Sequence, residues 1–194
     1  MSTSTTATPP AGTATQTGTK TTWAIDPSHS HVAFGIKHLM IATVRGSFTQ
    51  VQGTVTVDES DPTTASLDIT IATPSVTTGD EKRDGHLRSP DFFDVERYPT
   101  MIFHSKRVEP RSKETFRVIG DLTIRDVTRE VVLDVDMLGR AKDPWGKEHA
   151  AFEATTKIKR GDYGLTWNAA LETGGVLVGD EVKISIEAQL LKQG

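Results

Sequence analysis

The sequence predicts an all-β fold, an antiparallel barrel of about eight long strands with one short helix near residues 78–89. Three observations lead to this prediction. Apolar and polar residues alternate with a period of two in one segment after another, which is typical of strands with one buried face. Turn-forming residues separate these segments. One stretch between them carries a helix-start signal instead of strand alternation.

The alternation defines the strands in order along the chain. Val32, Phe34 and Ile36 share one phase, and Ile184 and Ile186 repeat the pattern near the other end. Residues 129–142 alone would extend to roughly 45 Å at about 3.3 Å per residue, which suits a deep barrel. Strands are expected at 22–26, 30–38, 43–58, 65–72, 101–110, 116–125, 129–142 and 148–160, with a ninth at 181–192.

Pairs and short runs of turn-forming residues divide these strands. Proline fixes φ and lacks a backbone donor, while glycine and aspartate tolerate turn conformations. Turns are therefore expected at Asp26-Pro27, Asp61-Pro62, Glu109-Pro110, Asp143-Pro144-Trp145-Gly146 and Gly174-Gly175.

The helical stretch follows the fourth strand of this series. Thr78 and Glu81 have the spacing of a capping box, and Pro90 prevents the helix from continuing. Two interpretations are open. The helix is either a plug sealed over one barrel end by Leu87 and the phenylalanines that follow, or a lid whose arginines contact a polar head group. An ion pair between Arg83 and Asp84 is the structural alternative to ligand contact.

The interior of the barrel is not decided by periodicity. Eight strands enclose either packed side chains or one small ligand. The inward phase carries aliphatic residues together with Phe34, Phe103, Phe116 and Phe152, which suits both outcomes.

Composition limits the domain organisation and the partners. The 194 residues suit one domain, expected over 23–194, and the formal net charge of −4 argues against a nucleic-acid partner. Cysteine is absent, which excludes disulfides and thiolate catalysis. Residues 1–22 are rich in Thr, Ala and Pro and lack the apolar core of a secretory signal. We therefore expect a disordered tail and a cytoplasmic location.

Histidine offers the main alternative chemistry. His29 and His31 are spaced to share a strand face, and His38, His86, His104 and His149 are the remaining imidazoles that could complete a metal site. No His-Glu-x-x-His helix, nucleophile elbow or phosphate-binding glycine loop accompanies them. We therefore expect hydrogen-bonded strand histidines, with no catalytic residue, metal or cofactor.

Several ordered motifs point to a known family. They include Asp26-Pro27-Ser28-His29-Ser30-His31, Arg83-Asp84-Gly85-His86-Leu87-Arg88, Gly120-Asp121-Leu122-Thr123 and Asp162-Tyr163-Gly164-Leu165-Thr166-Trp167, with further matching runs at 37–40, 44–48, 89–94 and 98–99. Together they closely resemble the YceI-like polyisoprenoid-binding family, in order from about Trp23 to Lys192. Asp126 stands where the family often has glycine, at a turn that aspartate tolerates.

The resemblance implies an extended, lipocalin-like barrel that holds a long isoprenoid chain, such as a polyprenyl phosphate or a quinone, without covalent chemistry. It places the cavity wall at Phe34, Ile36, Phe48, Leu87, Phe92, Phe93, Phe103 and Trp167. It places His38, Arg83, His86 and Arg88 near the entrance or the head group.

Three functional hypotheses follow. Storage or transport of an isoprenoid lipid comes first, with transient membrane contact as an accompanying expectation. An enzyme acting on an apolar substrate, with His29, His31 or His38 as base or metal ligand, is the second. A structural protein with a solidly packed barrel is the third. A homodimer would be expected if a strand edge or an open barrel seam were exposed.

Overall fold

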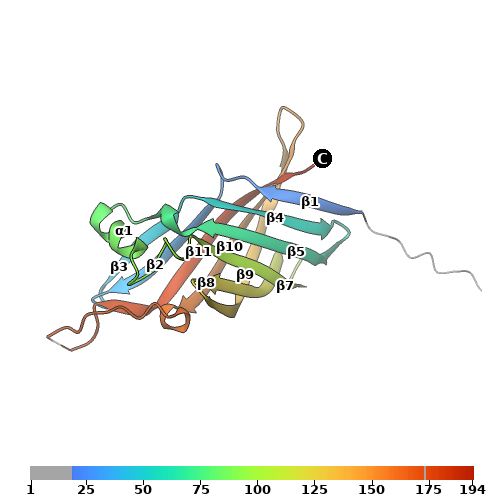
Figure 1. Cartoon of the computed structure of the whole chain (residues 1–194). Coiled ribbons are helices and arrows are strands. Elements are labelled where there is room, and N and C mark those ends of the chain that lie inside the picture. Colours follow the sequence, from blue (N-terminus) through green and yellow to red (C-terminus); the bar gives the residue numbers. More distant parts are fainter. Residues whose placement is uncertain (1–18, 173) are drawn as a thin grey trace, which may run out of the picture.

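The computed structural model describes residues 19–172 and 174–194. Its strands form one antiparallel sheet that curls into an elongated barrel (Figure 1). One α-helix, α1 (Glu81–Arg88), and two 3-10 turns, η1 (Thr73–Ser75) and η2 (Arg160–Tyr163), accompany the strands in the described residues. The strands are β1 Lys20–Ile25, β2 His31–His38, β3 Ala42–Phe48, β4 Val51–Asp58, β5 Asp61–Ala72, β6 Val76–Thr77, β7 Thr100–Pro110, β8 Thr115–Ile124, β9 Val127–Lys142, β10 Glu148–Lys159 and β11 Val178–Lys192.

The eleven strands occupy eight positions around a closed ring. β1 and β2 share one position, because both pair with β11, β1 over residues 190–192 and β2 over 178–187. β4 and β3 share the next position, and β5 and β6 the one after it. β7 to β11 fill the other five, and the pairing of β1 with β11 closes the ring. The predicted eight-stranded antiparallel barrel is confirmed.

At each of the three shared positions, a short break separates the two strands. The breaks lie at residues 26–30, 49–50 and 73–75. Pro27 and Pro74 remove backbone donors there, and the Ser75 hydroxyl accepts a hydrogen bond from the Gln50 amide at 3.1 Å. The prediction of one strand over residues 43–58 is therefore wrong, since it divides between β3 and β4.

Further boundaries differ from the prediction. The turn expected at Glu109-Pro110 lies at residues 111–114 instead, because Glu109 and Pro110 still pair with β8 at the end of β7. The turn expected at Asp61-Pro62 lies two residues earlier, at residues 59–60, and Pro62 is the second residue of β5, where a ladder donor is not needed. β1 begins at Lys20, so residues 20–22 belong to the barrel and not to the predicted tail. Residues 1–18 of that tail lie outside the described residues.

The helix α1 is capped differently from the prediction. Asp80 is the N-cap, and its carboxylate accepts a hydrogen bond from the Arg83 amide at 2.9 Å. The Thr78 and Thr77 hydroxyls instead donate to the buried Asp84 carboxylate, and Arg83 Nε donates to Thr78 at 2.8 Å. The expected capping box and the expected Arg83–Asp84 ion pair are both replaced by this network.

The barrel has two distinct ends (Figure 1). We call one the helix end, where α1, the β2–β3 turn at residues 39–41 and the η2 segment lie. We call the other the hairpin end, where the turns at 59–60, 111–114 and 143–147 lie. The ladder between β5 and β7 stops at Asp68 and His104, so residues 61–67 have no register partner on β7. In the described part of the chain, no helix is long and apolar enough to cross a membrane.

Candidate functional site

The barrel contains an elongated cavity of about 790 Å³. Its lining includes Thr78 and Arg83 from the helix end and Glu59 and Lys113 from the hairpin end, so the cavity extends along the barrel. A solidly packed barrel, the third hypothesis, is contradicted by this cavity. The volume falls in the range of about 300–1,000 Å³ that is usual for sites binding small molecules.

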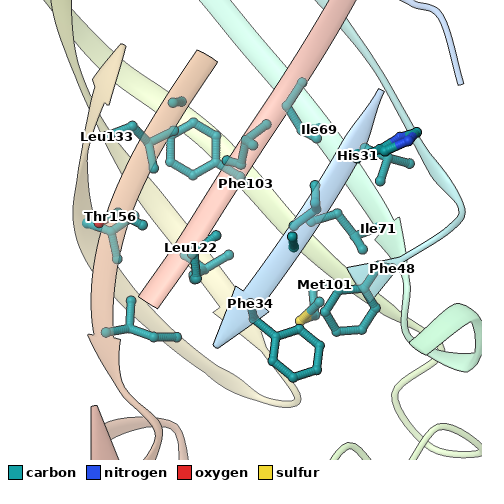
Figure 2. Close-up of a pocket in the computed structure, with 18 of the residues that line it drawn as sticks. His31, Phe34, Phe48, Ile69, Ile71, Met101, Phe103, Leu122, Leu133 and Thr156 are labelled. Carbon is teal, nitrogen blue, oxygen red and sulfur yellow. The ribbon is translucent and has the colours of Figure 1, made fainter. Parts of the chain in front are cut away.

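Aliphatic and aromatic side chains form nearly all of the wall. The strand alternation sends every second residue inward, so strands from around the ring each contribute apolar groups. Figure 2 shows them projecting into one common space. The labelled apolar members are Phe34, Phe48, Ile69, Ile71, Met101, Phe103, Leu122 and Leu133.

Two of the wall phenylalanines lie over glycines of the neighbouring strand. A Cβ atom on Gly46 would lie 2.5 Å from the Phe34 ring, and one on Gly120 would lie 2.5 Å from the Phe103 ring and 2.4 Å from the His104 carbonyl oxygen. These distances are far inside van der Waals contact. The two glycines therefore provide the space in which the rings lie along the wall.

Aromatic rings gather at the helix end in two groups. Phe48 contacts Phe34 at 5.7 Å between ring centroids and Phe93 at 5.4 Å. A second group joins His86, Phe92 and Trp167, with centroid separations of 4.7 to 5.5 Å. Residues far apart in the sequence are thus brought together around one end of the cavity.

Eleven of the twelve residues predicted for the site line this cavity. They are Phe34, Ile36, His38, Phe48, Arg83, His86, Leu87, Phe92, Phe93, Phe103 and Trp167. Arg88 lies elsewhere: its guanidinium donates to the carbonyl oxygens of Pro74 at 2.9 Å and Val76 at 2.7 Å. Arg88 therefore ties α1 to the segment before it, which is a structural role.

Arg160 is a site residue that the sequence did not reveal. Its side chain is buried and donates to the carbonyl oxygens of Gly179, Leu165 and Trp167 at 2.7 to 2.8 Å. Burial lowers the pKa of the guanidinium, and the charge of Asp180 partly offsets this. Arg160 thus fastens the segment that carries Trp167 to the start of β11.

Tyr163 is the second such residue. Its side chain is 2% exposed and lines the cavity, and its hydroxyl has no hydrogen-bond partner in the structure. Burial, with a smaller effect from the charge of Asp162, raises the pKa of this phenol to about 12. The only sequence signal was its place in the motif Asp162-Tyr163-Gly164, which does not show where the ring points.

The histidines are not assembled into a metal site. Over residues 19–172 and 174–194, no group of three or more His, Cys, Asp or Glu side chains is placed to hold a metal ion. His29 instead pairs with Asp26 at 2.9 Å, and His86 pairs with Asp91 at 2.9 Å. Of the three proposed catalytic histidines, His31 and His38 line the cavity.

The comparison with protein families places the chain. A model described as the YceI-like domain matches residues 23–190. The chain belongs to the YceI-like family. A curated relative, the UPF0312 protein of Staphylococcus aureus strain N315, is 39% identical over 170 residues, which cover 87% of this chain and 96% of that protein.

Solved structures of YceI-like proteins share this barrel. The Campylobacter jejuni YceI protein matches with a TM-score of 0.71 and 33% identity, covering 81% of this chain and 90% of its own. A polyisoprenoid binding domain from Saccharophagus degradans matches with a TM-score of 0.63, covering 87% of this chain and 97% of its own. At 15% identity the second likeness concerns the fold alone.

Proposed function

We propose that this YceI-like protein binds a long isoprenoid lipid, such as a polyprenyl phosphate or an isoprenoid quinone, and stores or transports it without covalent chemistry. The observation that carries this proposal is the elongated cavity of about 790 Å³ with a nearly continuous aliphatic and aromatic wall. Such a wall suits an extended hydrocarbon chain and offers few polar groups for a compact polar substrate.

Apolar burial is sufficient to explain useful affinity. Micromolar binding needs about 8 kcal/mol of net free energy, and association costs about 4–15 kcal/mol. Each buried methylene contributes about 0.8 kcal/mol, so about 15–29 buried carbons would supply the ~12–23 kcal/mol that the two requirements add up to. A chain of a few isoprene units supplies them.

The comparisons support the proposal at the level of the family. The Saccharophagus degradans domain is described as binding a polyisoprenoid. Because that likeness concerns the fold alone, the lining of this barrel is the stronger support. No particular contact favours the enzyme hypothesis: His29 pairs with Asp26 but does not line the cavity, and His31 and His38, which do, have no carboxylate partner among the described residues.

We further propose that the helix end contacts membranes during lipid transfer. The β2–β3 turn exposes three successive apolar side chains, Leu39, Met40 and Ile41, which are 38%, 60% and 81% exposed. His38, next to this turn, lines the cavity. Leu39 and Met40 also adopt positive φ angles of 52° and 60°, a conformation unfavourable for such residues. An apolar tip beside the cavity suits insertion at a lipid surface.

Two further expectations stay predictions. The pairing of β1 with β11 closes one seam of the barrel, whereas residues 61–67 of β5 keep an edge without a register partner on β7, so a homodimer stays a prediction. Its test is the molecular mass in solution. A cytoplasmic location is checked by fractionation of cells that produce the protein.

The binding proposal is tested by filling the cavity from two neighbouring positions of β9. Leu133 lines the cavity, whereas Val132 is 39% exposed. We expect Leu133→Trp to weaken binding of geranylgeraniol at least about tenfold, equivalent to ~1.4 kcal/mol, and Val132→Trp to leave it unchanged. Isothermal titration of delipidated protein measures both. Equal affinity in both variants would place the ligand outside the barrel.

A further inference from the structure

The Tyr163 hydroxyl is a polar group without a hydrogen-bond partner among the described residues, and it faces a cavity whose wall is mostly apolar. The residue is 2% exposed and lines the cavity, and residues 19–172 and 174–194 offer its oxygen no hydrogen-bond partner. Buried hydroxyl groups in native proteins are hydrogen-bonded in the large majority of cases. An exception that faces a cavity is therefore a candidate contact for whatever occupies that cavity.

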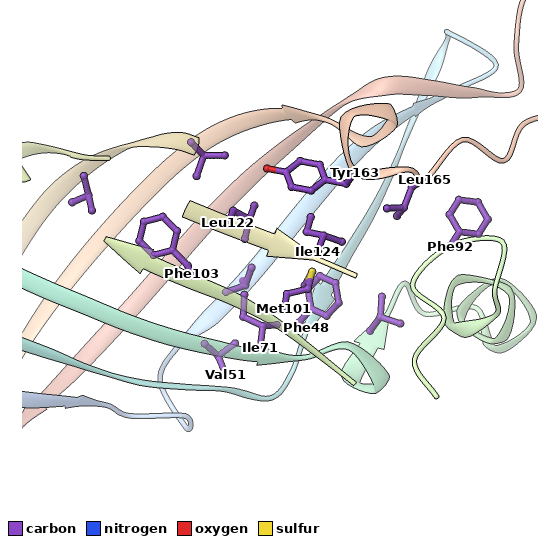
Figure 3. Close-up of a cluster of buried hydrophobic side chains, with 14 of the residues drawn as sticks. Phe48, Val51, Ile71, Phe92, Met101, Phe103, Leu122, Ile124, Tyr163 and Leu165 are labelled. Carbon is purple, nitrogen blue, oxygen red and sulfur yellow. The ribbon is translucent and has the colours of Figure 1, made fainter. Parts of the chain in front are cut away.

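The fold holds this ring in a defined place. Tyr163 ends the η2 turn, and Gly164 follows it in the left-handed conformation with φ of 74°, which turns the chain sharply. The ring belongs to the main buried apolar cluster of the barrel. Figure 3 shows the hydroxyl directed toward the barrel interior, on the side where Leu122 lies.

The surroundings of this hydroxyl favour one chemical class of hydrogen-bond acceptor. A tyrosine hydroxyl is protonated at neutral pH, and burial raises the pKa of Tyr163 further, to about 12, so the group can act as a hydrogen-bond donor. The cation on the same turn, Arg160, already gives Nε and Nη1 donors to the carbonyl oxygens of Gly179, Leu165 and Trp167. A charged phosphate at this depth would therefore find little compensation, whereas an uncharged oxygen would need only the one donor.

We propose that Tyr163 donates a hydrogen bond to an uncharged acceptor oxygen, a carbonyl or a hydroxyl, on the otherwise apolar ligand. The inference rests on the proposed function, because it requires an isoprenoid in the barrel. It adds the chemical class of the head group and the residue that recognises it. Isoprenoid quinones and prenols both present such an oxygen.

The test combines removal of the protein hydroxyl with removal of the ligand oxygen. Tyr163→Phe is compared with wild type in binding geranylgeraniol, a short-chain ubiquinone, geranylgeranyl phosphate and the hydrocarbon phytane. Tyr98→Phe is the matched control, because Tyr98 is not among the residues lining the cavity. Thermal unfolding of each ligand-free variant accompanies the titrations.

We expect Tyr163→Phe to lose about five- to tenfold in affinity for the alcohol, the quinone or both, as for one neutral hydrogen bond. Affinity for phytane should be unchanged, and the ligand-free protein should unfold at the same or a higher temperature, since no protein partner is lost. Tyr98→Phe should change none of these affinities.

Other outcomes overturn the inference in recognisable ways. Equal losses for the oxygenated ligands and phytane would mean that the ring acts by packing alone. A loss of affinity confined to geranylgeranyl phosphate would show that the acceptor of the Tyr163 hydrogen bond is a charged oxygen. If Tyr163→Phe keeps the wild-type affinity for all four probes, Tyr163 plays no part in ligand recognition. If wild type binds none of the four probes, the proposed function itself fails.

Discussion

Arg160 shows how one side chain organises the helix end. Its guanidinium donates to three carbonyl oxygens from two segments, those of Leu165 and Trp167 after the η2 turn and that of Gly179 at the start of β11. The planar fork of arginine reaches several acceptors in fixed directions, whereas lysine offers one ammonium group. The geometry of this residue therefore matters more than its charge.

Arg160→Lys should lower the free energy of unfolding by about 2–4 kcal/mol, because at least two buried carbonyl oxygens lose their donors. Arg129→Lys is the control, since Arg129 makes an exposed contact with the Asp162 carbonyl at 3.3 Å. Urea unfolding measures both. Similar small losses in the two variants would show that the Arg160 fork is dispensable.

Adding a methyl group to a glycine should have opposite effects on stability in the barrel wall and in the helix α1. A Cβ on Gly120 meets backbone and the Phe103 ring, whereas one on Gly85 in α1 meets nothing within 4 Å. Gly120→Ala should destabilise the protein by about 1–3 kcal/mol through overpacking. Gly85→Ala should stabilise it by about 0.5–1 kcal/mol through helix propensity. Chemical denaturation measures the change in the free energy of unfolding for both variants. An unchanged stability in Gly120→Ala would contradict the close contact between Gly120 and the Phe103 ring.

At the scale of elements, the Asp84 network couples α1 to the segment before it. Burial of Asp84 opposes its ionisation, but the hydrogen bonds from Thr78 and Thr77 outweigh this effect and lower the pKa of the carboxyl. A carboxyl with a lowered folded-state pKa stabilises the protein above the unfolded value, about 3.9, and loses this contribution as the pH falls through the folded value.

Asp84→Asn should therefore be less stable than wild type by about 2 kcal/mol at pH 7. The difference should shrink as the pH falls below about 4, where wild type loses its own contribution. Glu81→Gln, an exposed change in the same helix, is the control and should differ from wild type at pH 7 by much less than Asp84→Asn. Thermal unfolding between pH 2 and pH 7 gives the comparison. A difference that does not vary with pH would rule out the ionised network.

The β2–β3 turn yields a prediction about transfer. Met40→Asp with Ile41→Asp should slow delivery of a fluorescent prenol to vesicles about tenfold, because apolar contact with the lipid surface is lost. Aspartate also tolerates the positive φ at position 40, so stability should not fall. Trp145→Asp, at the 84% exposed tip of the hairpin end, is the control. Slower transfer in Trp145→Asp alone would show that the hairpin end, and not the helix end, contacts the membrane.

Much of this element pattern was predictable, and its failures have physical causes. Period-two alternation located most of the long strands, because each has one inward face. It could not locate the break between β3 and β4, since there the Gln50 amide donates to Ser75 of the η1 turn, which is distant in sequence. It also missed that β1 and β2 share one position in the ring, which only their common pairing with β11 reveals.

At the scale of the whole molecule, the sequence could not show that the barrel is hollow. Periodicity assigns each residue to a face but gives no volume, and Phe34 or Phe103 suits a packed core as well as a cavity wall. The predicted wall residues came from the family motifs and do line the cavity. Tyr163 and Arg160 were not predicted as cavity residues, because their orientation depends on the η2 turn, which strand periodicity does not describe.

Mass spectrometry of an organic extract, from protein purified without detergent, decides whether the barrel carries a lipid. We expect a prenyl lipid in roughly one-to-one ratio with the protein, and loss of that lipid in Leu133→Trp. A lipid-free extract, from protein that also fails to take up added prenols or quinones, would show that the barrel does not bind isoprenoids.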